Sequence, residues 1–596
     1  MGEILIARSI ITMDDETPRA EAVAIDEGKV VALGSLSDLR QRFDTWPVRN
    51  DYANNVIIAG LIDQHLHPFL AATTLTCDVV APEAWVLPHR TYAATTSPQD
   101  YDTTLRELGA KGEGWFFSWG YHRLWHGELS RERLDSLIPH RPVAVWQRSV
   151  HEWYLNSAAI EALDLSPATF DRLPGANTMY SLGRGHFWEA AMGVILGCLS
   201  PHFLTEERFR SGLTMLRDYL HMNGVTAINE PGIFWAFEPF ALYQEILGAP
   251  ETPFTTSFFV DGRSQALQRK DVATIVADAQ RQVERAPEGK VALRDKHVKF
   301  FADGAIVSQL MQMYEPYLDA DGKPDPHHHG EWLMEPEVLA EYFAPYWDAG
   351  WQAHIHVNGD WGLDVVLDVL DDSQRRLPRL DHRTTIVHFA NSTYDQVQRI
   401  AKLGAIVSAN PYYPVGFADA YSAFGLGPAR ADVMVRARDV LNAGIPLSYH
   451  SDLPIAPADP LALASFGVNR TTASGRVAGP EQCVSVHEAL RAITIESAYS
   501  WREEHSLGSI SVGKWANLTV LDADPYEVDP RELGAIGISA VIHHGNHHHV
   551  PQHLRDARTQ ARSNTTTSMF TEAESRGCAC NTARLVTELW ADSLAS

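Results

Sequence analysis

The sequence predicts an α/β fold: a (β/α)₈ TIM barrel with a small β-sandwich domain formed by both termini and an insertion after the first barrel strand. Three observations predict it. Short apolar runs alternate with helical stretches through the middle of the chain, strand-like pairs occur at both ends, and one long segment breaks the alternation. Strand–helix alternation favours parallel βα units. A chain of 596 residues exceeds one simple core, so we expect one large domain with additions.

The two ends of the chain read as strands. Residues 3–33 alternate around the hairpin signal Asp26-Glu27-Gly28, and residues 508–522 read as turn, strand, turn and strand. We therefore expect residues 1–58 and 505–552 to be the two parts of the β-sandwich domain. The remaining tail, residues 553–596, is polar, and we expect it to be weakly ordered and to end in a short helix.

The middle of the chain, residues 59–504, is expected to form the barrel. Its apolar runs each close in polar or ionisable residues: VIIAGLIDQHLH, HVKFFADGA, WQAHIHVNGD, RTTIVHFAN, GAIVSANP and IPLSYHSD. In a closed barrel the C-terminal ends of the strands meet at one rim, where functional side chains gather. Residues from about 70 to 200 are instead rich in Trp, His and Pro, and we expect them to form the insertion.

Composition narrows the partners and the compartment. Hydrophobic residues make up 45% and charged residues 21%, which is typical of a soluble globular protein. A formal net charge of -26 makes nucleic acid and anionic membrane surfaces poor partners. The N-terminus shows no signal peptide, and no run is apolar enough to span a bilayer. Five cysteines are too sparse for a disulfide framework, so we expect a cytoplasmic protein.

Two histidines begin the candidate site. His65 and His67 are two residues apart at the end of an apolar run, so in a strand both imidazoles point to one face. Two imidazoles make half a site for zinc or a similar divalent ion. A bare pair is a weak signal in a chain with 27 histidines. The same placement recurs, however, at the ends of four later apolar runs: Lys299, His356, His388 and Asp452.

Lys299 is the unusual member of these six candidate ligands. A protonated ammonium repels a metal ion, but a buried lysine loses its proton readily. Reaction of the neutral amine with CO₂ would give a carbamate anion that can bridge two metals. The alternative is that Lys299 simply pairs with Asp303. The apolar surroundings of the strand favour the carbamate.

The motifs together resemble the amidohydrolase superfamily, and within it the amidohydrolase-3 branch that includes N-substituted formamide deformylases. GLIDQHLHP is similar to the first-strand motif of that branch, VKFFADGA to its lysine strand, and IHVNGD and IVHF to its fifth and sixth strands. SDLP is similar to the eighth-strand aspartate motif, and RPVAVWQRSVHEWYLNSAA to the characteristic insertion. The resemblance runs from about residue 3 to residue 550. It also implies a homodimer, the oligomeric state that is usual in this family.

The resemblance implies a centre of one or two divalent ions, with zinc as the expected metal. His65 and His67 would bind one ion, and His356 and His388 the other. A carboxylated Lys299 and a hydroxide would bridge them. A bound metal lowers the pKa of water from about 15.7 to about 7 and polarises a substrate carbonyl.

Two residues receive catalytic roles. The resemblance implies that Asp452 binds one metal and the bridging water, takes the proton from that water and delivers it to the departing nitrogen. His151, within SVHEWYLNS, is predicted to contact substrate or stabilise the oxyanion; the alternative is a structural histidine that caps a loop. Gln64 stands where the family usually has a small hydroxyl residue, and His450 where Gly commonly precedes Ser-Asp. These two departures bear on substrate preference.

Other histidines and cysteines look like metal-binding motifs but are not expected to bind a metal, and the two histidine tracts among them are called the decoy tracts. Adjacent side chains in a strand point to opposite faces, so the tracts at 327–329 and 547–549 are expected to face solvent without sharing an ion. Cys578 and Cys580 have no second pair nearby, so a zinc knuckle is not expected.

The predicted function is hydrolysis of a non-peptide, amide-like C–N bond in a small molecule, an N-substituted formamide or N-acyl amine. A cyclic-amide hydrolase, a deaminase and an ester hydrolase remain open on the same site. A catalytically silent barrel that only binds ligand is the alternative from a different class. The presence of all six ligands argues against it.

Overall fold

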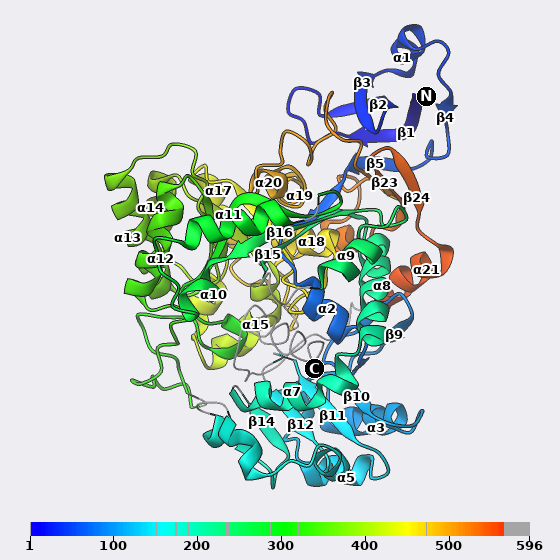
Figure 1. Cartoon of the computed structure of the whole chain (residues 1–596). Helices are drawn as coiled ribbons and strands as arrows, with labels where there is room; N and C mark the ends of the chain where they lie inside the picture. The colour runs from blue at the N-terminus through cyan, green and yellow to red at the C-terminus, as the bar shows by residue number, and fades with distance from the viewer. Residues whose placement is uncertain are drawn as a thin grey trace.

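The computed structural model describes residues 2–564 apart from 149, 151, 173–175, 189, 234–238, 287, 320 and 473. Figure 1 shows three regions: a central barrel, a sheet built from both ends of the chain, and the insertion on the opposite side of the barrel. The α/β fold class with a (β/α)₈ barrel is confirmed.

Eight parallel strands form the barrel, hydrogen-bonded in chain order from first to last. Four of them are buried at every residue, as expected when helices surround a parallel sheet. The strands are β6 (Leu61–Asp63), β15 (Val225–Ile233), β16 (Thr255–Asp261), β17 (Val291–Phe301), β18 (Gln352–Val357), β19 (Thr385–His388), β20 (Ile406–Ala409) and β21 (Leu447–Tyr449). Beyond β21, the Asp452 amide donates to the His65 carbonyl at 2.9 Å and brings the last strand to the first.

Helices that follow the strands cover the barrel: α11 (Ile275–Arg285), α12 (Pro336–Asp348), α13 (Asp360–Arg376), α14 (Tyr394–Leu403), α17 (Ala437–Asn442) and, after the last strand, α18 (Pro460–Asn469). Two helices, rather than one, cover the first strand. The short α2 (Pro68–Thr74) packs against α8 (Glu206–Met222). Gly212 makes this approach available, because a Cβ there would overlap the Ala72 carbonyl oxygen. The packing fixes α2, which begins immediately after His67.

The terminal segments form one sheet. Its main order is β24-β23-β22-β5-β1-β2-β3, with β4 paired to β1. The N-terminal strand β5 lies between N-terminal β1 and C-terminal β22, so neither end completes the sheet alone. The strands are β1 (Glu3–Ile11), β2 (Arg19–Asp26), β3 (Lys29–Gly34), β4 (Val48–Arg49), β5 (Val56–Ala59), β22 (Leu518–Leu521), β23 (Ile538–His543) and β24 (Asn546–His549).

The insertion enters the chain between β6 and β15 and has a six-stranded sheet of its own. Arg148 joins it to the barrel. Its guanidinium forms a buried ion pair with Glu83, lies over the rings of Trp85 and Trp119, and donates to the Ile455 carbonyl at 3.3 Å. The insertion strands are β7 (Asp78–Val79), β10 (Phe116–Tyr121), β11 (Val143–Gln147), β12 (Glu152–Leu155), β13 (Tyr180–Ser181) and β14 (His186–Trp188).

The segment after the terminal sheet begins with a helix, α21 (Gln552–Asn564), which the polar composition did not indicate. Arg558 anchors it: the buried guanidinium pairs with both carboxylate oxygens of Asp459, at 2.8 and 3.0 Å. The predicted helix near the end of the chain, together with Cys578 and Cys580, lies outside the described residues. No helix in the described part of the chain has the length and apolar character needed to cross a membrane.

Candidate metal centre

The first barrel strand delivers two imidazoles to the mouth of the barrel. β6 ends at Asp63, whose buried carboxylate accepts the Ser451 amide at 3.1 Å and so ties the first strand end to the last. Burial raises the pKa of Asp63 to about 7. His65 and His67 follow at once, both almost fully buried, and His67 is the N-cap residue of α2.

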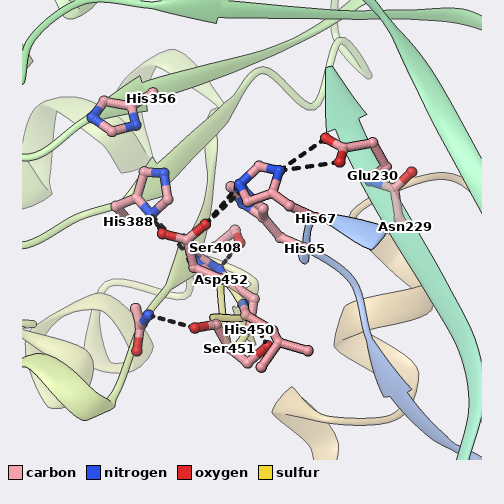
Figure 2. A network of polar contacts seen from close by, with 12 residues as sticks. His65, His67, Asn229, Glu230, His356, His388, Ser408, His450, Ser451 and Asp452 are labelled. Carbon is pink, nitrogen blue, oxygen red and sulfur yellow. Dashed lines mark hydrogen bonds and ion pairs between the residues drawn. The ribbon is translucent and has the colours of Figure 1, made fainter. Parts of the chain in front are cut away.

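Both imidazoles converge on one carboxylate oxygen. His67 Nε2 lies 2.9 Å and His65 Nε2 lies 3.5 Å from Asp452 Oδ1. One ligand atom from each of these three residues lies within 4.8 Å of the other two. Figure 2 shows the arrangement, with the Asp452 carboxylate between His67 and His388. Two neutral nitrogens and a carboxylate oxygen are a donor set that suits zinc.

Glu230, near the end of β15, contacts His67 at Nδ1, the ring nitrogen that does not face Asp452. Its two carboxylate oxygens both lie 3.1 Å from His67 Nδ1, and the side chain is buried (Figure 2). Because a carboxylate only accepts, His67 must donate from Nδ1, which leaves Nε2 facing Asp452. A carboxylate on the outer nitrogen of a ligating histidine fixes the ring and raises its basicity.

The charges on either side of His67 favour a cation at its Nε2. Burial alone would lower the pKa of His67, but Glu230 and Asp452 together raise that pKa to about 10. His65 differs: burial and then the Lys299 charge hold its pKa well below the ordinary value. His65 is therefore neutral, as a ligand must be, whereas His67 without a metal carries a proton that an ion bound at Nε2 would displace.

The middle strands bring the remaining candidates to the same rim. His388 ends β19, and its Nδ1 lies 4.0 Å from Asp452 Oδ2. The His356 ring on β18 packs on the His388 ring with centroids 4.3 Å apart, and its Nε2 lies 3.0 Å from Asn358 Nδ2. Lys299 on β17 is fully buried, with Nζ 5.2 Å from the centre of the Phe301 ring.

Asp303, offered by the sequence as the alternative partner for Lys299, holds the backbone of the next loop. Its carboxylate accepts the amides of Gln312, Asn358 and Gly359 at 2.7–2.9 Å. These bonds position the end of β18, where His356 lies.

Two candidate ligands have left-handed backbone. His388 has φ 76° and Asp452 has φ 56°, a region that residues with a Cβ rarely adopt. Such conformations cost about 1–3 kcal/mol each and gather at functional sites. The surrounding contacts that hold both residues there place their side chains against the imidazoles of the first strand.

His450 is a further imidazole in the cluster. It is fully buried, its Nε2 lies 3.2 Å from His388 Nδ1, and its ring stacks on His65 with centroids 4.6 Å apart. One nitrogen each from His65, His388 and His450 lies within 4.8 Å of the others. The sequence marked this residue only as a departure from the family pattern.

Sequence reasoning also missed Glu230. The signal was present, because the apolar run at residues 225–228 ends in Asn-Glu-Pro-Gly as the other strands end in polar residues. His151 lies outside the described residues. Among the residues that the structure describes, both groups of three His, Cys, Asp or Glu residues with ligand spacing are in this cluster, so neither decoy tract is among them.

The decoy tracts bind their own surroundings. His328 and His329 contact the Gln309 and Met313 carbonyls at 2.8 and 3.0 Å. His547 lies between the Tyr52 hydroxyl and Glu3, and the His549 ring lies beside the same Tyr52 ring with centroids 5.9 Å apart.

A sequence model of the amidohydrolase family matches residues 51–548. The chain belongs to the amidohydrolase family. The matched segment contains all six residues expected from the sequence as ligands, and membership of this family supports a metal-dependent hydrolase.

Relatives match this chain over most of their own length. Putative amidohydrolase YtcJ of Bacillus subtilis is 24% identical, with 90% of this chain and 97% of the relative covered. N-substituted formamide deformylase of Arthrobacter pascens is 25% identical, with 89% and 95% covered. An uncharacterised metal-dependent hydrolase of Pyrococcus horikoshii has a similar fold, with a TM-score of 0.68 at 20% identity over 89% of this chain and 99% of that one.

The residues present fit a divalent ion on their own chemistry. His388 Nε2 is buried and has no hydrogen-bond partner among the described residues, and such a nitrogen is costly unless a ligand satisfies it. It lies in a cluster of imidazoles around one carboxylate. The amidohydrolase therefore has a His/Asp cluster able to bind a metal.

Proposed function

We propose that this amidohydrolase cleaves the C–N bond of a small N-substituted formamide or N-acyl amine. The observation that carries the proposal is the convergence of His65 Nε2 and His67 Nε2 on Asp452 Oδ1 at the barrel mouth. The substrate class is supported by the printed activity of the Arthrobacter relative, N-substituted formamide deformylase.

We assign metal binding to His65, His67, Lys299, His356, His388 and Asp452, with one or two zinc ions expected and Lys299 carboxylated if it bridges them. When bound, the metal supplies Lewis acidity and makes water a nucleophile at neutral pH. The chain's own residues do the rest. Glu230 orients His67, and the strained Asp452 holds a carboxylate between the imidazoles.

Proton transfer is assigned to Asp452. Its Oδ1 faces His65 and His67, so Oδ2 is the oxygen that we propose accepts a proton from water and returns it to the leaving nitrogen. The return matters because an amine leaves poorly as an anion. His151 is proposed to contact the substrate, and the His151→Ala variant should then raise KM more than it lowers kcat.

A substrate panel tests the proposal. Metal-loaded enzyme is given N-substituted formamides, N-acyl amines, a cyclic amide, an ester and an amino-substituted heterocycle. Released amine, ammonia, alcohol and acid are measured separately, and ring opening of the cyclic amide is followed by mass spectrometry. We expect amine and formate or another acid in equal amounts, and no turnover by Asp452→Asn. Ammonia release would instead identify a deaminase, ring opening a cyclic-amide hydrolase, and alcohol release an ester hydrolase. Absence of turnover by metal-loaded enzyme on every substrate would support a silent ligand-binding barrel.

A further inference from the structure

We propose that His450 is a metal ligand of this centre, acting together with His65 and His388. His450 follows β21 directly and precedes Asp452 by two residues, so the last strand brings both side chains to the rim. Figure 2 shows its ring below the Asp452 carboxylate, on the side of the cluster opposite His356. The ring is fully buried, so its nitrogens must be satisfied inside the protein.

The spacing of the nitrogens suits a shared ion. Two imidazoles on one tetrahedral zinc have ligand nitrogens about 3.3 Å apart, from Zn–N bonds of about 2.0–2.1 Å. His450 Nε2 and His388 Nδ1 are 3.2 Å apart, so here His388 would bind through Nδ1, which also lies 3.3 Å from the Tyr413 hydroxyl, and not through Nε2. His65 adds a third imidazole, and one ring nitrogen from each of the three residues lies within 4.8 Å of the other two.

The outer nitrogen of His450 is held as ligating histidines require. Its Nδ1 lies 2.8 Å from Ser408 Oγ, and the Gln64 amide donates to the same hydroxyl. A hydroxyl oxygen can accept from both, so Nδ1 can carry the proton and leave the Nε2 lone pair directed at His388. Gln64 also donates to Ser448 Oγ at 3.3 Å, which fixes the amide. The two departures from the family pattern, Gln64 and His450, are thus parts of one hydrogen-bonded unit.

A simpler arrangement is an ordinary hydrogen bond between two imidazoles. The barrel contains such a pair lower down, where His297 Nδ1 lies 3.1 Å from His354 Nε2. That pair belongs to neither group of three ligand-spaced residues found in the described chain. It offers a matched control, because it has the same contact and burial without the third donor.

The test measures metal binding, so it is independent of whether formamides are substrates. Full-length protein is stripped with a chelator and titrated with zinc against a chromophoric competitor, and cobalt(II) spectra report the ligand set. The variants are His450→Gly, His450→Gln, Ser408→Ala and the control His297→Gln. We expect zinc affinity to fall at least 100-fold in both His450 variants and about 10-fold in Ser408→Ala. The cobalt bands should shift in the His450 variants, and His297→Gln should stay within threefold of the parent.

Unchanged affinity and an unchanged cobalt spectrum in folded His450→Gln would overturn the proposal and leave a hydrogen bond to His388. If His450→Gly fails to fold, His450→Gln and Ser408→Ala decide the question, because Ser408→Ala keeps the imidazole and removes the hydroxyl that contacts both His450 Nδ1 and Gln64. An equal loss in His297→Gln would also overturn it, since the effect would then reflect any buried imidazole.

Discussion

Replacement of Glu230 by Gln tests how the first metal ligands are held. Gln keeps the shape of the side chain but removes the charge that faces His67 Nδ1 through two contacts of 3.1 Å. Removing an outer partner of a ligating histidine costs 10- to 100-fold in metal affinity. That range equals about 1.4–2.7 kcal/mol. We expect the upper part of the range, because Glu230 is only 4% exposed and water screens the pair poorly.

The assay is competition for zinc between the stripped protein and a chromophoric chelator at fixed pH. Glu152→Gln is a matched control, because it makes the same change at a Glu–His pair, 2.7 Å from His186, in the insertion sheet. Parental affinity in Glu230→Gln would refute the reasoning that this carboxylate prepares His67 for a metal. A comparable loss in Glu152→Gln would assign the effect to general destabilisation.

Three further outcomes are expected. Exhaustive chelation should abolish turnover and added zinc should restore it, with metal content measured beside activity; full activity of stripped protein would contradict a metal-dependent reaction. Arg558→Met should destabilise the fold by about 3 kcal/mol, because it leaves buried Asp459 without its cationic partner, and a melting temperature equal to the parent's would exclude that. Glu488→Gln should cost about 1 kcal/mol at pH 7, since Arg438 lowers the pKa of Glu488 to about 2. This stabilisation is complete above the unfolded pKa near 4.5 and fades as pH falls towards 2, so the difference in melting temperature from the parent should shrink between pH 5 and pH 3.

The barrel and most of its rim could be predicted because local pattern determines them. Each candidate ligand ends an apolar run, and parallel strands bring such ends to one side without further information. His65 and His67 needed only the two-residue period of a strand. The same logic would have found Glu230, had the run at residues 225–228 been counted as a strand.

Contacts between distant residues could not be predicted in this way. Gln64 and Ser408 are 344 positions apart, and nothing in either neighbourhood indicates that they meet beneath His450. The left-handed backbone of His388 and Asp452 is likewise set by surrounding structure, since residues with a Cβ adopt it uncommonly, although Asp and His do so more often than most. The helix α21 was not predicted because its main contact is an ion pair between Arg558 and Asp459, which are 99 positions apart in the sequence.

The interleaved terminal sheet has a consequence for how the chain is made. About 460 residues separate β5 from its neighbour β22, so at ribosomal speeds of about 5–20 residues per second the nascent β5 waits roughly 20–90 s for that neighbour. Until then its apolar residues Val56–Ala59 present an unsatisfied edge that can pair with another polypeptide. Slow synthesis or high expression should therefore favour aggregation that begins at the amino-terminal end, long before the hydrolytic machinery has assembled.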